Sequence, residues 1–236
     1  MIKGIYTAGR SLVHRTKNID VIANNLANIS TTGYKREIPF SEIINSVGEI
    51  GTKKLSSQLQ GEIIQTSNPL DLALDGQGFF ATKNEDGMLE LTRDGRFKVS
   101  DDGYLIDNNK RRVLGKNGAI SMEELMQTKD AHILVTKSGE IKVGNKTIDQ
   151  ILILDVYDAS ALQRSGGSNF LIDGEQYFAA NEDNYSVSQG FLEGANTNPM
   201  IEMQAMIQLN KEYESTTKIM AALDKSLEQA NEIGKV

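Results

Sequence analysis

Apolar residues recur every seven positions at the start of the chain. One row consists of Ile5, Leu12, Ile19 and Leu26, and a second row, offset by three residues, contains Ala8, Ile22 and Ile29. A mean spacing of 3.5 residues is typical of a coiled-coil seam. Arg15 interrupts the second row, and Gly33 can adopt the positive φ that often ends a helix. The pattern therefore predicts a long N-terminal helix that packs along one stripe.

The same spacing returns at the other end of the chain. Asn198-Pro199 predicts a helix start, because asparagine caps the first N–H groups and proline fits the first turn. The two rows that follow are Met206, Tyr213, Met220 and Leu227, and Leu209, Thr216, Leu223 and Ala230. We expect residues 1–35 and 195–236 to form one helical assembly domain.

Between the two ends the period changes from 3.5 to 2. Leu70, Leu72 and Leu74 alternate with Asp71 and Asp75, which predicts a strand with the acids facing outward. Turn dipeptides follow at short intervals, namely Asp86-Gly87, Asp94-Gly95, Asp102-Gly103, Asn117-Gly118, Ser138-Gly139 and Gly144-Asn145. Such dipeptides between apolar stretches predict hairpins.

These patterns predict an α+β fold. The long N- and C-terminal helices form an antiparallel coiled-coil-like pair, and residues 62–194 form a central all-β domain of many short strands. A short helix around residues 122–126 interrupts that domain, and residues 36–61 are a connector without an assigned element.

Charge and composition exclude several classes of protein. The 236 residues carry 25 Lys+Arg and 32 Asp+Glu, a net charge of −7. An acidic chain is not a general nucleic-acid binder. The absence of cysteine excludes disulfides, thiol nucleophiles and cysteine zinc sites. The longest aliphatic run, Ile151 to Leu154, is too short to cross a bilayer, and Lys3 and Arg10 break any apolar core of a secretory signal. We expect no membrane insertion.

The charge also divides along the chain. Residues 1–36 hold six Lys/Arg and one Asp, hence +5, whereas residues 191–236 hold four Lys and seven Asp/Glu, hence −3. The remaining middle segment is −9. A positive N-terminal helix and a negative C-terminal helix are suited to pairing with each other.

Candidate catalytic chemistry is weak. Gly76-Gln77-Gly78-Phe79-Phe80-Ala81 matches a dinucleotide fingerprint in form, but the turn at Asp86-Gly87 leaves no room for the required helix. We expect a glycine hairpin with two buried phenylalanines instead. His14 and His132 have no metal-ligand partners at suitable spacing. The acids Asp71 and Asp75 are more typical of a soluble strand face than of a catalytic pair. No catalytic, metal or cofactor-binding residue is predicted.

Three asparagines lie where the first helix ends. Asn24, Asn25 and Asn28 are poor helix formers, which fits either a frayed end or amides that hydrogen-bond to neighbouring helices and fix register. We favour the second interpretation because Leu26 and Ile29 continue the seven-residue pattern. The predicted assembly interface comprises Ile5, Leu12, Ile19, Ile22, Asn24, Asn25, Leu26, Asn28, Ile29, Met206, Leu209, Tyr213, Met220, Leu223 and Leu227.

Four segments together resemble a known family. Residues 20–35, which end in Thr32-Gly33-Tyr34-Lys35, resemble the N-terminal signature of bacterial flagellar rod and hook proteins. Residues 68–80, 91–97 and 190–199 are similar to that family's later motifs. The motif residues are Gly33, Tyr34, Asn68, Pro69, Leu70, Asp71, Gly76, Gly78, Phe79 and Phe80.

The resemblance implies a structural subunit of the flagellar axis, not an enzyme. Terminal helices in this family line the inner tube as a coiled coil, and the β domain forms the outer wall. The implied partners are further copies of the chain, other rod and hook axial proteins, and the flagellar type III export apparatus, which needs no cleaved signal. The implied location is the basal-body rod in the periplasmic space.

The short span between Lys35 and Asn68 and the single β region favour a rod subunit over a full-length hook protein. The modest length and the opening Gly4-Ile5-Tyr6-Thr7-Ala8 favour the proximal rod. A distal rod subunit or a short hook-type subunit is the alternative. A coiled-coil adaptor or a secreted enzyme on a β scaffold would also fit parts of the pattern.

Overall fold

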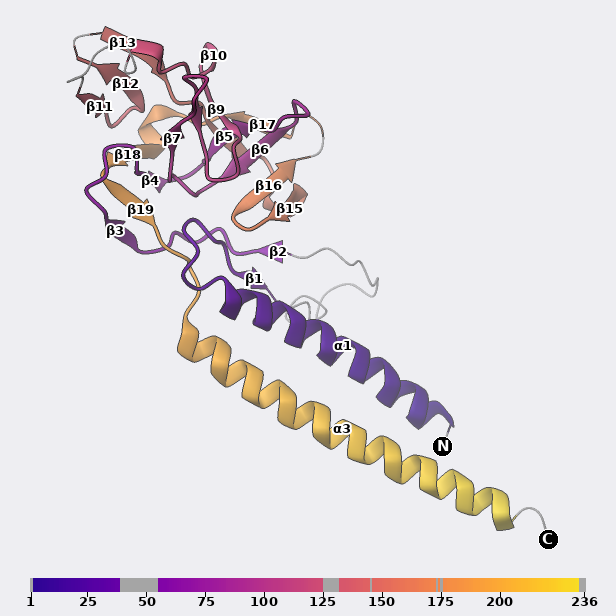
Figure 1. Cartoon of the computed structure of the whole chain (residues 1–236). Helices are drawn as coiled ribbons and strands as arrows, with labels where there is room; N and C mark the ends of the chain where they lie inside the picture. The colour runs from indigo at the N-terminus through magenta and orange to yellow at the C-terminus, as the bar shows by residue number, and fades with distance from the viewer. Residues whose placement is uncertain are drawn as a thin grey trace. The chain divides into compact units, whose positions relative to one another are not determined.

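The computed structural model describes residues 2–38, 55–124, 132–144, 146–172, 174 and 176–233. The chain is α+β, with a long helix near each end and many short antiparallel strands between them (Figure 1). It divides into two compact units. The helical unit contains residues 1–27, 37–55 and 198–236, and the strand unit contains residues 28–36 and 56–197. The segment 28–36 therefore belongs with the strands.

The helical unit is built on α1 (Ile2–Ala27) and α3 (Pro199–Ile233). The predicted start of the second helix is confirmed, because the Asn198 side-chain oxygen accepts from the backbone N–H groups of Met200 at 3.0 Å and Ile201 at 3.3 Å. Helix α1 ends at Ala27, six residues before Gly33, which has a φ of +66°. A short ladder of β1 (Glu37–Ile38) and β2 (Leu55–Ser56) lies in the segment expected to be a connector.

Three contacts define how α1 and α3 are paired. Asn25 lies opposite Glu202, Arg15 contacts Glu212, and a side chain at Gly4 would meet Leu223. The two residue numbers of each pair add up to 227, so the helices run antiparallel in one constant register. By this rule Ile2, where α1 begins, lies level with residue 225. The last two turns of α3 therefore extend past Ile2, the first residue of α1, as Figure 1 shows.

The strand unit contains seventeen strands among the described residues. They are β3 (Ile63–Gln65), β4 (Leu72–Gly76), β5 (Phe79–Lys83), β6 (Leu89–Thr92), β7 (Lys98–Val99), β8 (Leu105–Ile106), β9 (Arg112–Gly115), β10 (Gly118–Ala119), β11 (Ile133–Val135), β12 (Glu140–Val143), β13 (Lys146–Gln150), β14 (Ile153–Val156), β15 (Leu162–Gly166), β16 (Asn169–Ile172), β17 (Tyr177–Ala179), β18 (Tyr185–Gln189) and β19 (Phe191–Glu193). Two single 3-10 turns, Ala159–Ala161 and Glu182–Asn184, interrupt them.

The largest sheet has ten strands. Its main order is β15-β16-β6-β5-β9-β8-β7, with β14 joining β5 to β17 and β10 beside β9. Strands β11, β12 and β13 form a separate sheet, and two further pairs, β18 with β4 and β19 with β3, bring late strands back to early ones. All the pairings for which a register is defined are antiparallel.

Most of the predicted hairpins are present. The turns at Asp86-Gly87, Asp102-Gly103, Asn117-Gly118 and Ser138-Gly139 each join two paired strands. The turn at Gly144 also joins a pair, β12 with β13. Asp94-Gly95 does not, because β6 pairs with β5 and β16 while β7 pairs with β8. Local turn chemistry marks a change of direction but does not choose the partner strand.

Two expectations around the second motif are wrong. Gly76 and Gly78 do not form a hairpin, because β4 pairs with β18 whereas β5 belongs to the ten-stranded sheet. Asp71 does not face solvent: it is 7 % exposed and accepts a hydrogen bond from the Asn68 amide at 3.0 Å. The burial of the two phenylalanines is confirmed, since Phe79 and Phe80 both lie in the core.

The core of the strand unit has two apolar clusters. Phe80 belongs to the larger cluster and packs edge-on against Phe97, with ring centroids 5.2 Å apart. Phe79 belongs to the smaller cluster and packs edge-on against Phe170 at 5.9 Å. The two adjacent phenylalanines thus point into different clusters, on opposite faces of β5.

Two further expectations concern a short helix at 122–126 and membrane insertion. Within the predicted helix at 122–126, Met122 is not helical, Glu123 and Glu124 are helical, and residues 125 and 126 lie outside the described residues. No helix in the part of the chain that the structure describes is both long and apolar enough to span a membrane.

Candidate assembly interface

The predicted stripe of α1 faces α3. Ile22 is buried, and Ile5, Ala8, Leu12, Ile19 and Leu26 are half-buried. On α3 the half-buried positions include Met206, Leu209, Thr216, Met220, Leu223 and Leu227. Tyr213 departs from the expected row, because it is 41 % exposed and Glu212 lies on the inner face at its level.

Glu212 takes the inner position on α3 that the seven-residue pattern assigns to Tyr213. This explains why Arg15 interrupts the apolar row on α1. The Arg15 guanidinium forms a salt bridge with the Glu212 carboxylate and also donates to Ser11 at 3.3 Å. Hydrogen bonds from Gln208 and Arg15 lower the pKa of Glu212 below its usual range. A polar pair at one level of an apolar seam favours one register over shifted ones.

Of the three asparagines near the end of α1, Asn25 is the most deeply buried. It is fully buried, donates to the Glu37 carbonyl at 2.9 Å and accepts from the Glu37 N–H at 2.8 Å. Its amide also lies 3.5 Å from the Glu202 carboxylate of α3. Asn24 is exposed, whereas Asn28 is half-buried and accepts from Thr31 beyond the helix end, next to the half-buried Ile29.

The four family-like segments meet at a second place, inside the strand unit. We call it the buried charge cluster, and it consists of Lys35, Arg93 and Glu193. The Lys35 ammonium lies 2.6 Å from one carboxylate oxygen of Glu193, and the Arg93 guanidinium lies 3.1 Å from the other. These side chains are 1 %, 4 % and 0 % exposed. Each residue comes from a different segment of the resemblance.

Backbone groups complete the cluster. Lys35 donates to the Leu59 carbonyl at 2.8 Å, and Arg93 donates to the carbonyls of Leu74 at 3.0 Å and Gly76 at 2.7 Å. The Glu193 carboxylate also accepts from the Gly61 N–H at 2.9 Å. Because two cations share one anion, the cluster carries excess positive charge. The dipoles of the backbone carbonyl groups offset part of that charge.

Burial has a clear electrostatic consequence here. Desolvation lowers the pKa of Lys35 below its ordinary value, and the nearby Glu193 carboxylate opposes that shift. Desolvation likewise lowers the pKa of Arg93. The cluster therefore depends on Glu193, because it is the carboxylate that forms salt bridges with both buried cations.

The segments that lead to the two helices are joined beside this cluster. The Gly33 N–H donates to the Glu193 carbonyl at 2.7 Å, and the Asn196 N–H donates to the Tyr34 carbonyl at 3.2 Å. The ring of Tyr34 is buried beneath the Arg164 guanidinium, 4.4 Å away. Gly33 is required because a Cβ there would lie 2.3 Å from the Asp94 nitrogen.

The remaining motif residues shape the second segment. Asn68 and Asp71 form a local turn, and the carbonyl of the exposed Pro69 accepts from the Gln189 amide at 2.8 Å. Leu70 packs against the larger apolar cluster. At Gly76 a Cβ would lie 2.3 Å from the Asn184 carbonyl oxygen, and at Gly78 a Cβ would lie 2.7 Å from Ile153.

Sequence reasoning missed the cluster and the Arg15–Glu212 pair. Lys35, Arg93 and Glu193 lie within the resembling segments but were not singled out as site residues. The available signal was a charged residue inside an otherwise apolar and glycine-rich motif, as in Leu91-Thr92-Arg93. Charges at such positions are buried only when they are paired.

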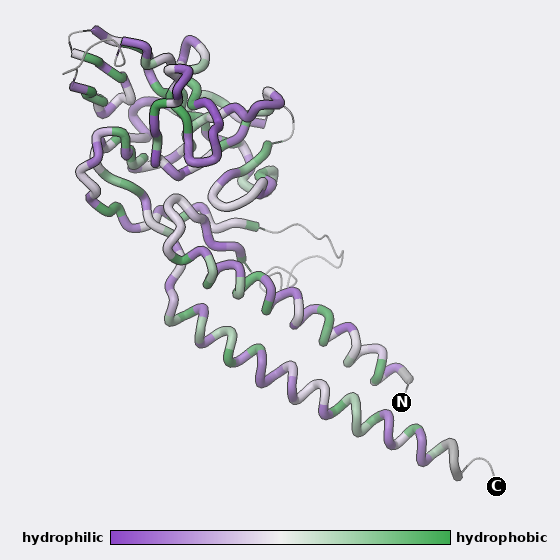
Figure 2. The backbone as a smooth tube through the Cα atoms, viewed as in Figure 1, coloured by the Kyte–Doolittle hydropathy of each residue, from purple (hydrophilic) through white to green (hydrophobic). Residues whose placement is uncertain are grey.

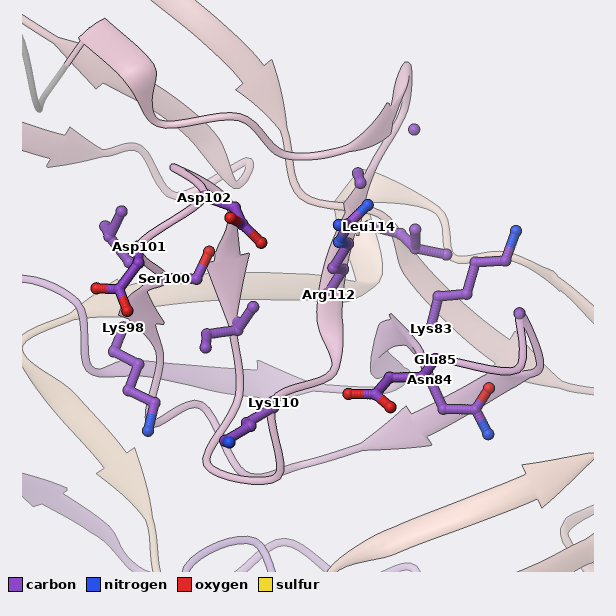
Figure 3. Close-up of a pocket in the computed structure, with 15 residues that line it drawn as sticks. Lys83, Asn84, Glu85, Lys98, Ser100, Asp101, Asp102, Lys110, Arg112 and Leu114 are labelled. Atoms are coloured by element: carbon purple, nitrogen blue, oxygen red, sulfur yellow. The ribbon is translucent and has the colours of Figure 1, made fainter.

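A hollow on the strand unit does not resemble a catalytic site. Its volume is about 980 Å³, and its charged lining consists of Lys83, Lys98, Lys110, Arg112, Glu85, Asp101 and Asp102. Figure 3 shows these side chains spread along the rim, without converging on one point. Among the described residues there is no group of three His, Cys, Asp or Glu side chains that could hold a metal ion.

Two long terminal helices with an apolar stripe, and a strand unit with a buried junction of four separated segments, favour a structural protein that packs through its helices. Comparison with known proteins gives the family. The model for flagella basal body rod protein matches residues 5–35, the flagellar hook protein FlgE/F/G D1 domain matches residues 73–143, and the flagellar basal body rod FlgEFG protein C-terminal model matches residues 188–233.

Curated relatives agree with these matches. The flagellar basal-body rod protein FlgF of Mesorhizobium japonicum is 24 % identical over 98 % of this chain and 97 % of its own length. FlgF of Rhizobium meliloti is 28 % identical, with 98 % of each chain covered. The rod protein FlgG of Buchnera aphidicola subsp. Baizongia pistaciae is 27 % identical over 97 % of this chain and 98 % of its own length. The chain belongs to the flagellar basal-body rod FlgE/F/G family and is a structural rod subunit, not an enzyme.

Proposed function

We propose that this chain polymerises through α1 and α3 and forms the proximal part of the flagellar rod. The observation that carries the proposal is the exposed apolar surface of the two helices. Eight large apolar residues on them are 41–72 % exposed, namely Tyr6, Val13, Met200, Ile201, Met203, Ile207, Tyr213 and Ile219. Figure 2 shows apolar positions along both helices. Apolar surface on more than one face of a helix indicates further protein partners.

The burial of the two helices also favours assembly over a self-sufficient hairpin. Most stripe residues of α1 and α3 are only half-buried in the pair, so contacts between subunits would remove further apolar surface from water. We expect the helix ends to become fully ordered on assembly.

Aspartate substitutions on the outer faces test this proposal. Val13→Asp and Ile207→Asp change exposed positions of α1 and α3 and should leave the monomer folded by circular dichroism. Both should abolish sedimentable polymer and fail to restore swimming to a strain that lacks the chain. Leu59→Asp is the matched control, because Leu59 is 76 % exposed but lies in the strand unit. Wild-type polymer and motility in both helix variants would refute assembly through these faces.

Length supports the proximal position. The alignment with FlgF of Mesorhizobium japonicum spans 237 positions, close to the 236 residues of this chain, whereas the alignment with the Buchnera FlgG spans 273. In isolated hook–basal bodies, an epitope label on this chain should lie in the membrane-side half of the rod. A label in the hook-side half would assign the chain to the distal rod, the alternative position.

We further propose that the chain reaches the rod through the flagellar type III export apparatus and meets other rod and hook subunits there. The cysteine-free composition fits a chain that is threaded unfolded. An epitope-tagged chain should be absent from the periplasm and medium of a strain with an inactive export apparatus. Its appearance there at the normal level would exclude this route.

A further inference from the structure

A groove runs along one flank of the helix pair, and we call it the flank groove. Its volume is about 670 Å³, and it lies between α1 and the Leu209–Glu212 turn of α3. Tyr6, Arg10, His14 and Asn18 of α1 line it at successive spacings of four residues. Residues four apart lie on one face of a helix, so the row forms one continuous wall about 18 Å long.

The polar groups of this wall have no partner within the described residues. Neither Arg10 nor His14 takes part in an ion pair or hydrogen bond there, and the same is true of the Asn18 side chain. Asn18 is only 6 % exposed although it carries an amide. The Asn18 amide is not one of the fully buried polar groups that lack a partner, so it still reaches the groove and can bind a group that enters it. The one acid of the lining, Glu212, is already bound by Arg15.

The complementary surface lies on the part of α3 that extends past α1. Because the pair register places residue 225 level with the start of α1, residues 226–233 have no helix opposite them among the described residues of their own chain. They form an overhang about 12 Å long. Glu228 lies on it, is exposed, and has no ion pair within the described residues.

We propose that the flank groove receives the α3 overhang of a second copy of this chain, with the Glu228 carboxylate bound by Arg10 and the Asn18 amide. The proposal rests on the proposed polymerisation through the terminal helices. The overhang is shorter than the groove, and its acid supplies the charge that the groove lacks. Hydrogen bonds between a guanidinium and a carboxylate are stronger than neutral ones, and complementary charges fix the register of an interface.

The geometry also explains continued growth. The groove and the overhang are different surfaces of the same chain, so the contact is heterologous, and every added copy offers a new groove and a new overhang. A self-complementary contact between two copies would instead close as a dimer.

A charge swap tests the pair. Arg10→Glu and Glu228→Arg should each raise the protein concentration needed for polymerisation at least about tenfold, and the double variant should recover most of that loss. Both residues are exposed, so each variant should keep the wild-type circular dichroism spectrum. Failure of the double variant to recover, while the wild type polymerises, would overturn the groove contact. Failure of the wild type to polymerise would instead refute the proposed function.

Cysteine crosslinking gives an independent measurement, because the chain contains no cysteine of its own. His14→Cys with Glu228→Cys should form disulfide-linked oligomers under mild oxidation. Within one chain the register places residue 14 level with residue 213, about 22 Å along α3 from residue 228, so any such bond joins two copies. Thr16→Cys with Glu228→Cys is the control, because Thr16 is exposed on the other flank of α1 and does not line the groove. Equal crosslinking of both pairs would contradict the proposal.

Discussion

Glu193 is the residue on which the buried charge cluster depends. Glu193→Gln keeps the size of the side chain and part of its hydrogen bonding but removes the only anion between Lys35 and Arg93. Breaking a buried pair by removing one partner typically costs about 3–5 kcal/mol. Since all three side chains are at most 4 % exposed, solvent cannot replace the lost charge. We expect the strand unit to lose this amount of unfolding free energy.

Urea unfolding of the full chain measures the effect. The transition midpoint should fall at an unchanged m-value, and the melting temperature of the strand unit should drop by about 6–20 °C. Glu182→Gln is the matched control, because Glu182 pairs with Lys116 at 2.9 Å with both side chains about half exposed. Exposed pairs contribute little, so this variant should behave like the wild type.

A Glu193→Gln variant as stable as the Glu182→Gln control would refute the reasoning. It would mean that the surrounding carbonyls of Leu59, Leu74 and Gly76 are sufficient to accommodate both cations. A stability loss that also changed the m-value would indicate a different folded or unfolded ensemble, which is outside the electrostatic argument.

Three further predictions follow from single positions. Gly33→Ala should destabilise the strand unit by more than about 1–2 kcal/mol in urea unfolding, because the φ of +66° is unfavourable and the new Cβ would meet Asp94; wild-type stability would contradict this. Gly9→Ala should stabilise α1 by about 0.5–1 kcal/mol in a thermal melt followed by circular dichroism, since nothing lies within 4 Å of the new methyl group. Lys35→Met tests the lowered pKa of Lys35. In the pH window below 10.5, the unfolded wild type binds more protons than the folded wild type, so the unfolding free energy of the wild type should rise with pH relative to that of the variant. A relative fall over this window would contradict the lowered pKa.

The two terminal helices show which features a local sequence pattern can predict. The seven-residue rows and the Asn198 cap are readable because a helix repeats every few residues and its ends are set by neighbouring groups. Gly33 has the expected positive φ, but α1 already ends at Ala27. The pattern also showed that Arg15 breaks a row. It could not show that Glu212, and not Tyr213, would meet Arg15, because that depends on the register between two helices nearly two hundred residues apart.

In the strand unit, local sequence predicted the turns but not the strand pairing. Glycine turns predicted five of the six hairpins, since a turn needs only its own residues and the flanking strands. The partner of β4 is β18, more than one hundred residues later, and alternation alone could not identify it. For the same reason Asp71 was expected to face solvent, although Asn68 binds its carboxylate and Gly190 donates to its carbonyl.

The sequence by itself determined the two long helices, the Asn198 cap, the β-rich middle and the family resemblance. These features depend on residue periods, turn chemistry and short motifs, all of which act over a few positions. Only the tertiary structure decided that Lys35, Arg93 and Glu193 meet, that Asn18 is 6 % exposed beside the flank groove, and that α3 extends past the start of α1. The physical reason is that burial and charge pairing depend on contacts between distant segments, which no local period specifies.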